Sequence, residues 1–152
     1  MKIAFIGLGI MGSNMASHLA KNNLNLTVYN RTPKNFETFG NSNVTIVDSI
    51  ENAIKDADVV FSMLSTPQVV EDLFFGQEGV LNSMKKNAIW ADCTTVNPSF
   101  SIRAFEEAKK YDIRFLDTPV SGSKIPAEKA ELIFQVGGEE ATLYEIEPYL
   151  NM

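Results

Sequence analysis

Residues 3–12 read Ile-Ala-Phe-Ile-Gly-Leu-Gly-Ile-Met-Gly, an apolar run that leads directly into three glycines with the spacing G-x-G-x-x-G. This pattern predicts a buried strand over residues 3–6, a tight turn, and a helix over residues 13–21 that carries Met15 and Leu19 on one face. In such a unit, the N–H groups and the dipole at the helix N-terminus attract the pyrophosphate of a dinucleotide. The stretch therefore indicates a dinucleotide-binding turn.

The three glycines of this turn are expected to have different roles. Gly7 can adopt the backbone angles of the tight turn, and Gly9 lacks a Cβ atom, so a pyrophosphate can approach the main chain there. Gly12 allows the helix to pack closely against the strand. The alternative is a turn that only packs tightly, because nine glycines can produce this spacing by chance. The candidate cofactor-binding residues of the turn are Gly7, Leu8, Gly9, Ile10, Met11 and Gly12.

The rest of the chain alternates short apolar runs with amphipathic stretches. Thr66-Pro67 and Asn97-Pro98 each place a capping side chain before a first-turn proline, and Asp48-x-x-Glu51 is similar to a capping box. Strands that alternate with helices predict a mainly parallel, doubly wound α/β sheet of the Rossmann type. Further strands are expected over residues 26–30, 44–47, 58–64, 88–92, 114–117 and 132–136, and later helices over residues 68–75, 98–110 and 139–150.

The composition excludes several classes of protein. The 152 residues, of which 45% are hydrophobic, suit one domain over residues 1–152 with a core of its own. One cysteine, Cys93, and one histidine, His18, allow neither an internal disulfide nor a Cys/His zinc site. The net charge is −6, and no apolar run reaches the about 18 residues of a membrane helix. We therefore expect a cytoplasmic protein with no metal, nucleic-acid partner or membrane partner.

Four residues that could suggest chemistry have simpler explanations. We expect His18 to be a solvated or packing residue of the first helix and Cys93 to be a small buried hydrophobe. Ile102 and Phe105 are expected to form the buried face of a helix and not a binding stripe. None of the four is therefore a candidate site residue.

The second expected strand ends in Asn30-Arg31-Thr32. In the NAD-binding version of this fold, an Asp or Glu at this place binds the ribose 2′-hydroxyl, and its carboxylate would repel a 2′-phosphate. Asn30 is neutral, the Arg31 guanidinium can bind a phosphate through two hydrogen bonds, and Thr32 adds a hydroxyl. The three residues therefore predict NADP (NADPH) in preference to NAD. The alternative is an exposed arginine in an ordinary turn.

Four motifs follow one another along the whole chain. After the glycine turn, residues 29–32 read Tyr-Asn-Arg-Thr and residues 92–96 read Asp-Cys-Thr-Thr-Val. Residues 117–128 read Asp-Thr-Pro-Val-Ser-Gly-Ser-Lys-Ile-Pro-Ala-Glu. In type and order, these motifs resemble the β-hydroxyacid dehydrogenase family, which includes 3-hydroxyisobutyrate dehydrogenase and the N-terminal domain of 6-phosphogluconate dehydrogenase. The last motif is most similar to that of the NADPH-dependent glyoxylate/succinic semialdehyde reductases.

The resemblance implies hydride transfer between NADPH and a small aldehyde, 2-oxo or 3-hydroxy acid such as glyoxylate or succinic semialdehyde. Lys124 belongs to the substrate loop in the relatives, and their catalytic lysine lies in a later glycine-rich segment, so no catalytic residue is expected in this chain. The implied site residues are Leu64, Ser65 and Thr95 beside the cofactor, and Ser121, Gly122 and Ser123 beside the substrate carboxylate.

Two departures from the family pattern stand out. Ala130 takes the place of the usual glycine, so the turn before Leu132 is expected to differ slightly. The sequence also stops at Met152, before the catalytic lysine and before the all-helical C-terminal domain that closes the pocket and forms the dimer in the family. The resemblance therefore implies that the 152-residue chain binds cofactor without turnover. It also implies homo-oligomers only where the helical domain is present.

Other functions stay open from the sequence. One is 3-hydroxyisobutyrate dehydrogenase activity, and another is a non-catalytic NADP-binding module, if the natural chain ends at residue 152. A methyltransferase or an NAD-linked epimerase could use a similar sheet, but the substrate-loop resemblance argues against both.

Overall fold

The computed structural model describes residues 1–22, 24–32, 36–39 and 43–152. Within these residues, the central sheet has seven strands in the order β3-β2-β1-β4-β5-β6-β9, and all strand pairs are parallel except β6–β9. The predicted Rossmann-type α/β fold is confirmed. The strands of this sheet are β1 (Lys2–Ile6), β2 (Asn25–Tyr29), β3 (Val44–Ile46), β4 (Val59–Ser62), β5 (Ile89–Asp92), β6 (Arg114–Asp117) and β9 (Gly137–Gly138).

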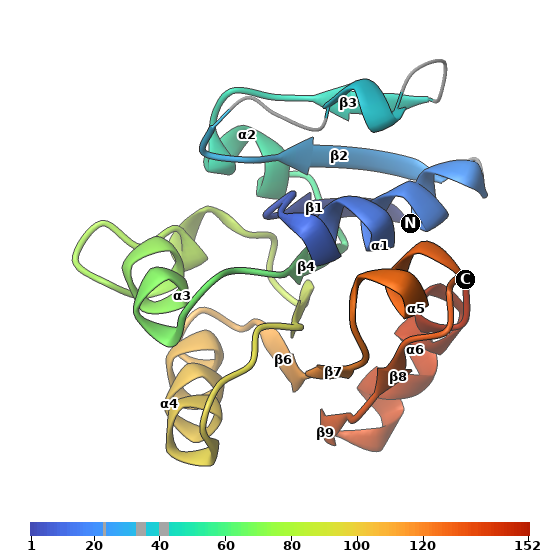
Figure 1. Cartoon of the computed structure of the whole chain (residues 1–152). Coiled ribbons are helices and arrows are strands. Elements are labelled where there is room, and N and C mark those ends of the chain that lie inside the picture. Colours follow the sequence, from blue (N-terminus) through green and yellow to red (C-terminus); the bar gives the residue numbers. More distant parts are fainter. Residues whose placement is uncertain (23, 33–35, 40–42) are drawn as a thin grey trace.

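Six α-helices of the described residues surround the sheet, together with 3₁₀ turns at Phe36–Phe39 and Leu81–Ser83. They are α1 (Ile10–Lys21), α2 (Ile50–Ile54), α3 (Pro67–Phe74), α4 (Pro98–Lys109), α5 (Lys124–Glu128) and α6 (Glu140–Leu150). Helices α2, α3 and α4 lie on one face of the sheet (Figure 1). They pack around Trp90, whose ring stacks on Phe74 with centroids 4.2 Å apart. On the other face, α1 and α6 pack around Phe5 and Phe61. Burial on both faces explains the nearly continuous apolar strands.

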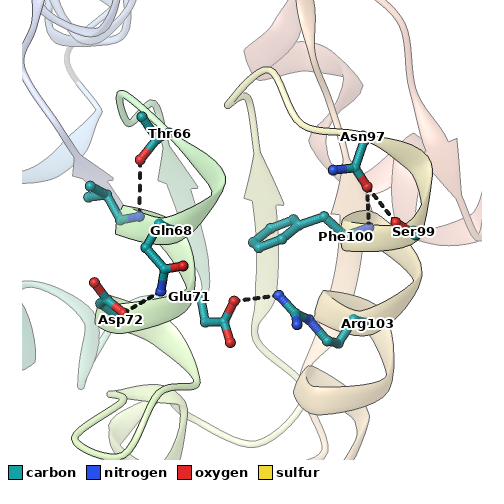
Figure 2. A network of polar contacts seen from close by, with 9 residues as sticks. Thr66, Gln68, Glu71, Asp72, Asn97, Ser99, Phe100 and Arg103 are labelled. Atoms are coloured by element: carbon teal, nitrogen blue, oxygen red, sulfur yellow. Dashed lines mark hydrogen bonds and ion pairs between the residues drawn. The ribbon is translucent and has the colours of Figure 1, made fainter.

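The predicted helix starts at Thr66 and Asn97 are confirmed, each with a proline at the first helical position (Figure 2). Thr66 Oγ1 accepts from the N–H of Val69 at 3.3 Å, and Asn97 Oδ1 accepts from the N–H of Phe100 at 3.0 Å. The prediction for α2 is wrong in detail. Its cap is Ser49, not Asp48, because Ser49 has extended backbone angles and its Oγ accepts from the N–H of Asn52 at 3.2 Å.

Contacts between α3 and α4 join the two helices over Trp90. The Arg103 guanidinium of α4 forms an ion pair with Glu71 of α3 and lies 5.4 Å from the centroid of the Phe100 ring (Figure 2). It also lies 5.8 Å from the centroid of the Phe75 ring. The helix that follows β4 is therefore held against the helix that follows β5.

The segment after β6 differs from the sequence-based expectation. Instead of one strand over residues 132–136, β8 (Ile133–Phe134) pairs antiparallel with β7 (Val120–Ser121) in a separate two-stranded sheet. The short β9 then adds to the central sheet at its β6 edge. Helix α5 lies between β7 and β8 along the chain. It was not expected from the sequence, because five residues around Pro126 are too few to show a helical period.

The expectation for Ile102 and Phe105 is wrong. Their side chains are 65% and 41% exposed, because α4 buries Phe100, Ala104 and Ala108, which lie four residues apart on its inner face. Small alanines bring this helix close to the sheet and leave the larger apolar residues outside. The expected burial of Cys93 is confirmed, with its Sγ 3.3 Å from the hydroxyl of Thr118.

Among the helices of the described residues, none combines the length and the apolar character that a membrane crossing requires.

Candidate functional site

A cavity of about 360 Å³ opens at the carboxyl ends of β1, β2 and β4. The strand order reverses between β1 and β4, and ligands of doubly wound sheets bind at such a reversal. Helix α3 forms the outer wall through Val69, Asp72 and Leu73. The predicted cofactor residues that line this groove are Gly7, Gly9, Asn30, Arg31, Thr32, Leu64 and Ser65.

The glycine turn has the geometry expected for two of its glycines. Gly7 has φ +96°, its N–H donates to the Tyr29 carbonyl at 2.9 Å, and a Cβ atom there would clash with the main-chain oxygen of Met63. A Cβ atom at Gly12 would clash with the Gly7 carbonyl and lie 3.2 Å from Phe5, so this glycine permits the close packing of helix on strand. Both structural expectations are confirmed.

Gly9 differs from the other two glycines because space is open around it. Apart from Gly9 itself and the chain directly around it, no atom of the described residues lies within 4 Å of the place that a Cβ atom would take, and the residue lines the groove. Gly9 is also the N-cap of α1, where no side chain forms a capping bond and the first turn contains no acidic residue. The start of α1 therefore offers its main chain and its dipole to an anion in the groove.

Asn30 joins the glycine turn to the end of β2. Its Oδ1 accepts from the N–H of Leu8 at 2.9 Å, and its Nδ2 donates to the carbonyl of Thr32 at 2.6 Å. An amide is suited to both bonds, since one side chain supplies an acceptor and a donor. Arg31 and Thr32 follow at the groove and are exposed. Within the described part of the chain, the Arg31 guanidinium has no ion-pair partner.

Five of the predicted cofactor residues do not line the groove, and Gly12, which packs against the Gly7 carbonyl, is one of them. The side chain of Leu8 is fully buried, Met11 packs partly buried against the core, and Ile10 is 66% exposed. These residues could contact a ligand in the groove only through their main chain. Thr95 is exposed after β5 and is also absent from the groove lining.

The predicted substrate-binding residues lie apart from the groove, between β7 and α5. Ser121, Gly122 and Ser123 are all exposed, and Gly122 has φ +142° with its Cβ position 2.6 Å from the side chain of Leu132. Lys124 forms an ion pair with Glu128 at 3.4 Å. The neighbouring His18 is a packing residue as expected, since its Nε2 lies 3.0 Å from the Ala127 carbonyl.

A buried series of polar side chains runs across β4 and β5, and it was not predicted from the sequence. Trp90 Nε1 donates to Ser62 Oγ, and Ser62 Oγ donates to Asp92 Oδ1, both at 2.8 Å. The N–H of Thr94 donates to the same carboxylate oxygen at 3.2 Å, and Thr94 Oγ1 accepts from the N–H of Leu64 at 3.0 Å. The sequence does contain a sign of a buried polar group here, because Asp92 directly ends the apolar run Ile89-Trp90-Ala91.

Asp92 is fully buried, and its hydrogen-bond partners within the described residues, Ser62 and Thr94, carry no charge. Burial raises the pKa of this carboxyl group to about 6, and hydrogen bonds from Thr94 and Ser62 oppose the rise. Its second oxygen, Oδ2, has no hydrogen-bond partner within the described residues. Asp117 is its partner in the register of β5 and β6, and burial raises its pKa too. The ends of these two strands therefore hold two carboxyl groups that resist ionisation.

No cluster of three or more His, Cys, Asp or Glu side chains in the described residues is arranged to hold a metal ion. The polar groups that line the groove are main-chain groups, the Arg31 guanidinium, the Asp72 carboxylate and neutral polar side chains.

The reversing parallel sheet, the glycine turn and the groove above it define a dinucleotide-binding Rossmann domain. Residues 2–152 match the family model described as the NAD binding domain of 6-phosphogluconate dehydrogenase, and the chain belongs to this family. The match confirms the family resemblance of the motifs.

Several proteins are similar along the whole chain. Glyoxylate/succinic semialdehyde reductase 2 of Arabidopsis thaliana is 33% identical, over 100% of this chain and 42% of the relative. An uncharacterized oxidoreductase of Bacillus subtilis is 35% identical, over 99% of this chain and 52% of the relative. The solved structure of Mycobacterium tuberculosis 3-hydroxyisobutyrate dehydrogenase with L-serine superposes with a TM-score of 0.90 at 30% identity, over 99% of this chain and 50% of that one. The chain thus spans about half the length of the relatives it matches.

Proposed function

We propose that this chain is the NADP-binding domain of an oxidoreductase that transfers a hydride between NADPH and a small aldehyde acid such as glyoxylate or succinic semialdehyde. One observation carries the proposal. The glycine turn and the Arg31 guanidinium open onto the same groove, and a neutral Asn30 takes the place of the carboxylate that selects NAD.

The residues of the groove fit a dinucleotide. Gly9 leaves open space at the start of α1, where a pyrophosphate would meet main-chain N–H groups and the positive end of the helix dipole. Gly7 and Asn30 fix the turn in place through their bonds to Tyr29 and Leu8. When bound, NADPH supplies the hydride chemistry, and the protein supplies position and charge.

The charge pattern at the end of β2 supports NADPH over NADH. A guanidinium 4 Å from a phosphate gains about 4 kcal/mol per unit charge at an effective dielectric of about 20, before the loss of hydration is counted. Asn30 adds no opposing charge because its amide is neutral, and both of its polar atoms are bonded to the main chain. We infer that Arg31 and Thr32 bind the 2′-phosphate.

The substrate side of the proposal has less direct support. Ser121 and Ser123 present hydroxyl groups on an exposed turn, as suits a small carboxylate, and the match to the Arabidopsis reductase covers the whole chain, this turn included. We propose that a helical domain outside residues 1–152 closes the pocket, supplies the acid that protonates the alkoxide and forms the oligomer. Isolated residues 1–152 are then expected to bind NADPH without turning over glyoxylate or succinic semialdehyde.

A second candidate function is 3-hydroxyisobutyrate dehydrogenase activity. The similarity to the mycobacterial enzyme of that name over nearly the whole chain favours it. The two candidates use the same cofactor groove and differ in the acid that is bound, so a substrate panel on the longer protein separates them.

The substitution Arg31→Ala tests the cofactor assignment. We expect NADPH to bind roughly 10- to 100-fold more weakly, because a charge-assisted hydrogen-bonded contact is lost, whereas NADH affinity should change less than about 3-fold. The dissociation constants of both cofactors are measured by calorimetry or by the quenching of Trp90 fluorescence.

Arg103→Ala is the matched control, since it removes a guanidinium from α4, away from the groove lining. It should leave both affinities unchanged. Equal losses for NADPH and NADH in Arg31→Ala would remove the 2′-phosphate assignment, and failure of the unaltered chain to bind either cofactor would overturn the proposed function.

A further inference from the structure

A side-chain hydrogen bond joins the segments that directly follow β4 and β5. Ser62 and Asp92 are register partners, and the N–H of Cys93 donates to the Ser62 carbonyl at 2.7 Å. One residue further along, the N–H of Leu64 donates to the side-chain hydroxyl of Thr94 at 3.0 Å. The Thr94 hydroxyl therefore extends the pairing of the two strands to the point where the chain turns into the groove.

Thr94 is held firmly enough to act as an anchor. Its side chain is buried, and its N–H is bonded to the Asp92 carboxyl group, which also accepts from Ser62. Ser62 in turn accepts from the indole of Trp90, the largest fully buried side chain. A continuous series of hydrogen bonds thus leads from the centre of the core to the N–H of Leu64.

Leu64 forms part of the groove wall next to the glycine turn. Its Cδ2 atom lies 2.9 Å from the place that a Cβ atom would take at Gly7, and both Leu64 and Ser65 line the cavity. Asn30, Arg31 and Thr32 form the wall on the β2 side, where the adenosine ribose is bound in this fold. The wall on the β4 side is consequently left for the nicotinamide half of the cofactor.

We propose that Thr94 is a positioning residue for the nicotinamide half of NADPH, acting through its hydrogen bond to Leu64 and not through contact with the cofactor. This inference rests on the proposed function. It differs from the expectation for Thr95, whose exposed side chain is outside the groove lining. Loss of the Thr94 hydroxyl leaves the N–H of Leu64 without its acceptor, and the β4 wall is then free to shift.

Two ligands separate a positioning role from a general loss of structure. NADPH contacts both walls, whereas 2′,5′-ADP contains the phosphorylated adenosine half and lacks the nicotinamide. In T94V, which keeps the side-chain shape, we expect NADPH to bind about 10-fold more weakly and 2′,5′-ADP to bind within about 2-fold of the unaltered chain. T94S retains the hydroxyl and should restore NADPH affinity.

T118V is the matched control. Thr118 is equally buried at the end of β6, and its hydroxyl contacts Cys93 Sγ at 3.3 Å, away from Leu64. It should lower stability by a similar amount without changing the affinity for either ligand. Circular dichroism melting curves show whether each variant folds.

Hydrogen exchange of the Leu64 N–H in the unaltered chain gives a readout that needs no substitution. NADPH should slow this exchange, and 2′,5′-ADP should not. The inference is overturned if T94V weakens both ligands equally, if it weakens neither, if T118V matches T94V, or if both ligands protect Leu64 alike. If the unaltered chain binds neither ligand, the proposed function itself fails and this inference fails with it.

Discussion

The carboxyl edge of the central sheet is built in two contrasting ways. After β1, β2 and β4, the edge is open, since the glycine turn exposes main chain to a groove of about 360 Å³ and Arg31 adds a positive charge. After β5 and β6, the edge is closed, and Asp92 and Asp117 lie in register with raised pKa values. A chain with a net charge of −6 can thus expose groups suited to an anion, because local donors and missing side chains matter more there than the overall charge.

The largest effect is expected from a methyl group in the glycine turn. Gly12→Ala places a Cβ atom against the Gly7 carbonyl, where neither the helix nor the turn can move independently. We expect the free energy of unfolding to fall by about 3 kcal/mol or more, beyond the about 1 kcal/mol that alanine gains in helix propensity. Urea titration monitored by circular dichroism measures the change.

Gly9→Ala is the counterpart on the open side of the same turn. Its Cβ atom meets no protein atom, so stability should stay within about 1 kcal/mol, the difference between Gly and Ala as an N-cap. The affinity for NADPH should fall, because the methyl group occupies space next to the main chain that we propose to bind the pyrophosphate. A Gly9→Ala variant that unfolds as easily as Gly12→Ala would contradict the assignment of an open and a packed glycine.

The closed part of the edge should respond to pH through Asp92. Its pKa is raised from 3.8 to about 6 in the folded protein, so folding favours the protonated carboxyl group. The resulting stabilisation is present below about pH 4 and is lost as the pH rises through about 6. Relative to Asp92→Asn, the unaltered chain should therefore lose up to about 3 kcal/mol between pH 4 and pH 7, measured by urea titration at each pH.

Asp58→Asn provides a control of opposite sign. The hydrogen bond from Lys85 lowers the pKa of Asp58, so its contribution is present above the ordinary pKa of an aspartate and is lost as the pH falls. The stability difference between the unaltered chain and this variant should grow with rising pH.

If the stability difference between the unaltered chain and Asp92→Asn does not depend on pH, the Asp92 carboxyl group is ionised in the folded protein throughout the range from pH 4 to pH 7.

The contrast between the two parts of the edge also sets how much the sequence could predict. The open part depends on local signals, which are three glycines at fixed spacing and a changed residue at the end of β2. Of the residues that these signals predicted, Gly7, Gly9 and residues 30–32 line the groove. The closed part depends on pairing between distant strands. Asp92, Thr94 and Leu64 are brought together by the register of β4 and β5, which no local period encodes.

The segment after β6 shows the same limitation. A run over residues 132–136 has the composition of a strand in the main sheet, but its pairing with β7 depends on the turn at Gly122 and on the short helix α5. On α4, apolar spacing alone could not distinguish Phe105 from Ala104, because the sheet accepts the small side chain on its inner face. Tertiary packing decided both outcomes.

The smallest expected effect concerns a turn in which this chain lacks a glycine. Ala130 has φ +57°, whereas the left-handed positions at Gly7 and Gly138 are glycines. At these backbone angles, an L-residue with a Cβ atom is strained by about 1 kcal/mol. Glycine relieves this strain, but part of the gain in stability is lost because glycine has greater conformational freedom in the unfolded chain. Ala130→Gly should therefore raise the free energy of unfolding by up to about 1 kcal/mol. Ala127→Gly, in the buried face of α5, should lower it by about 1 kcal/mol, so a loss of stability in both variants would show that the turn at Ala130 is not strained.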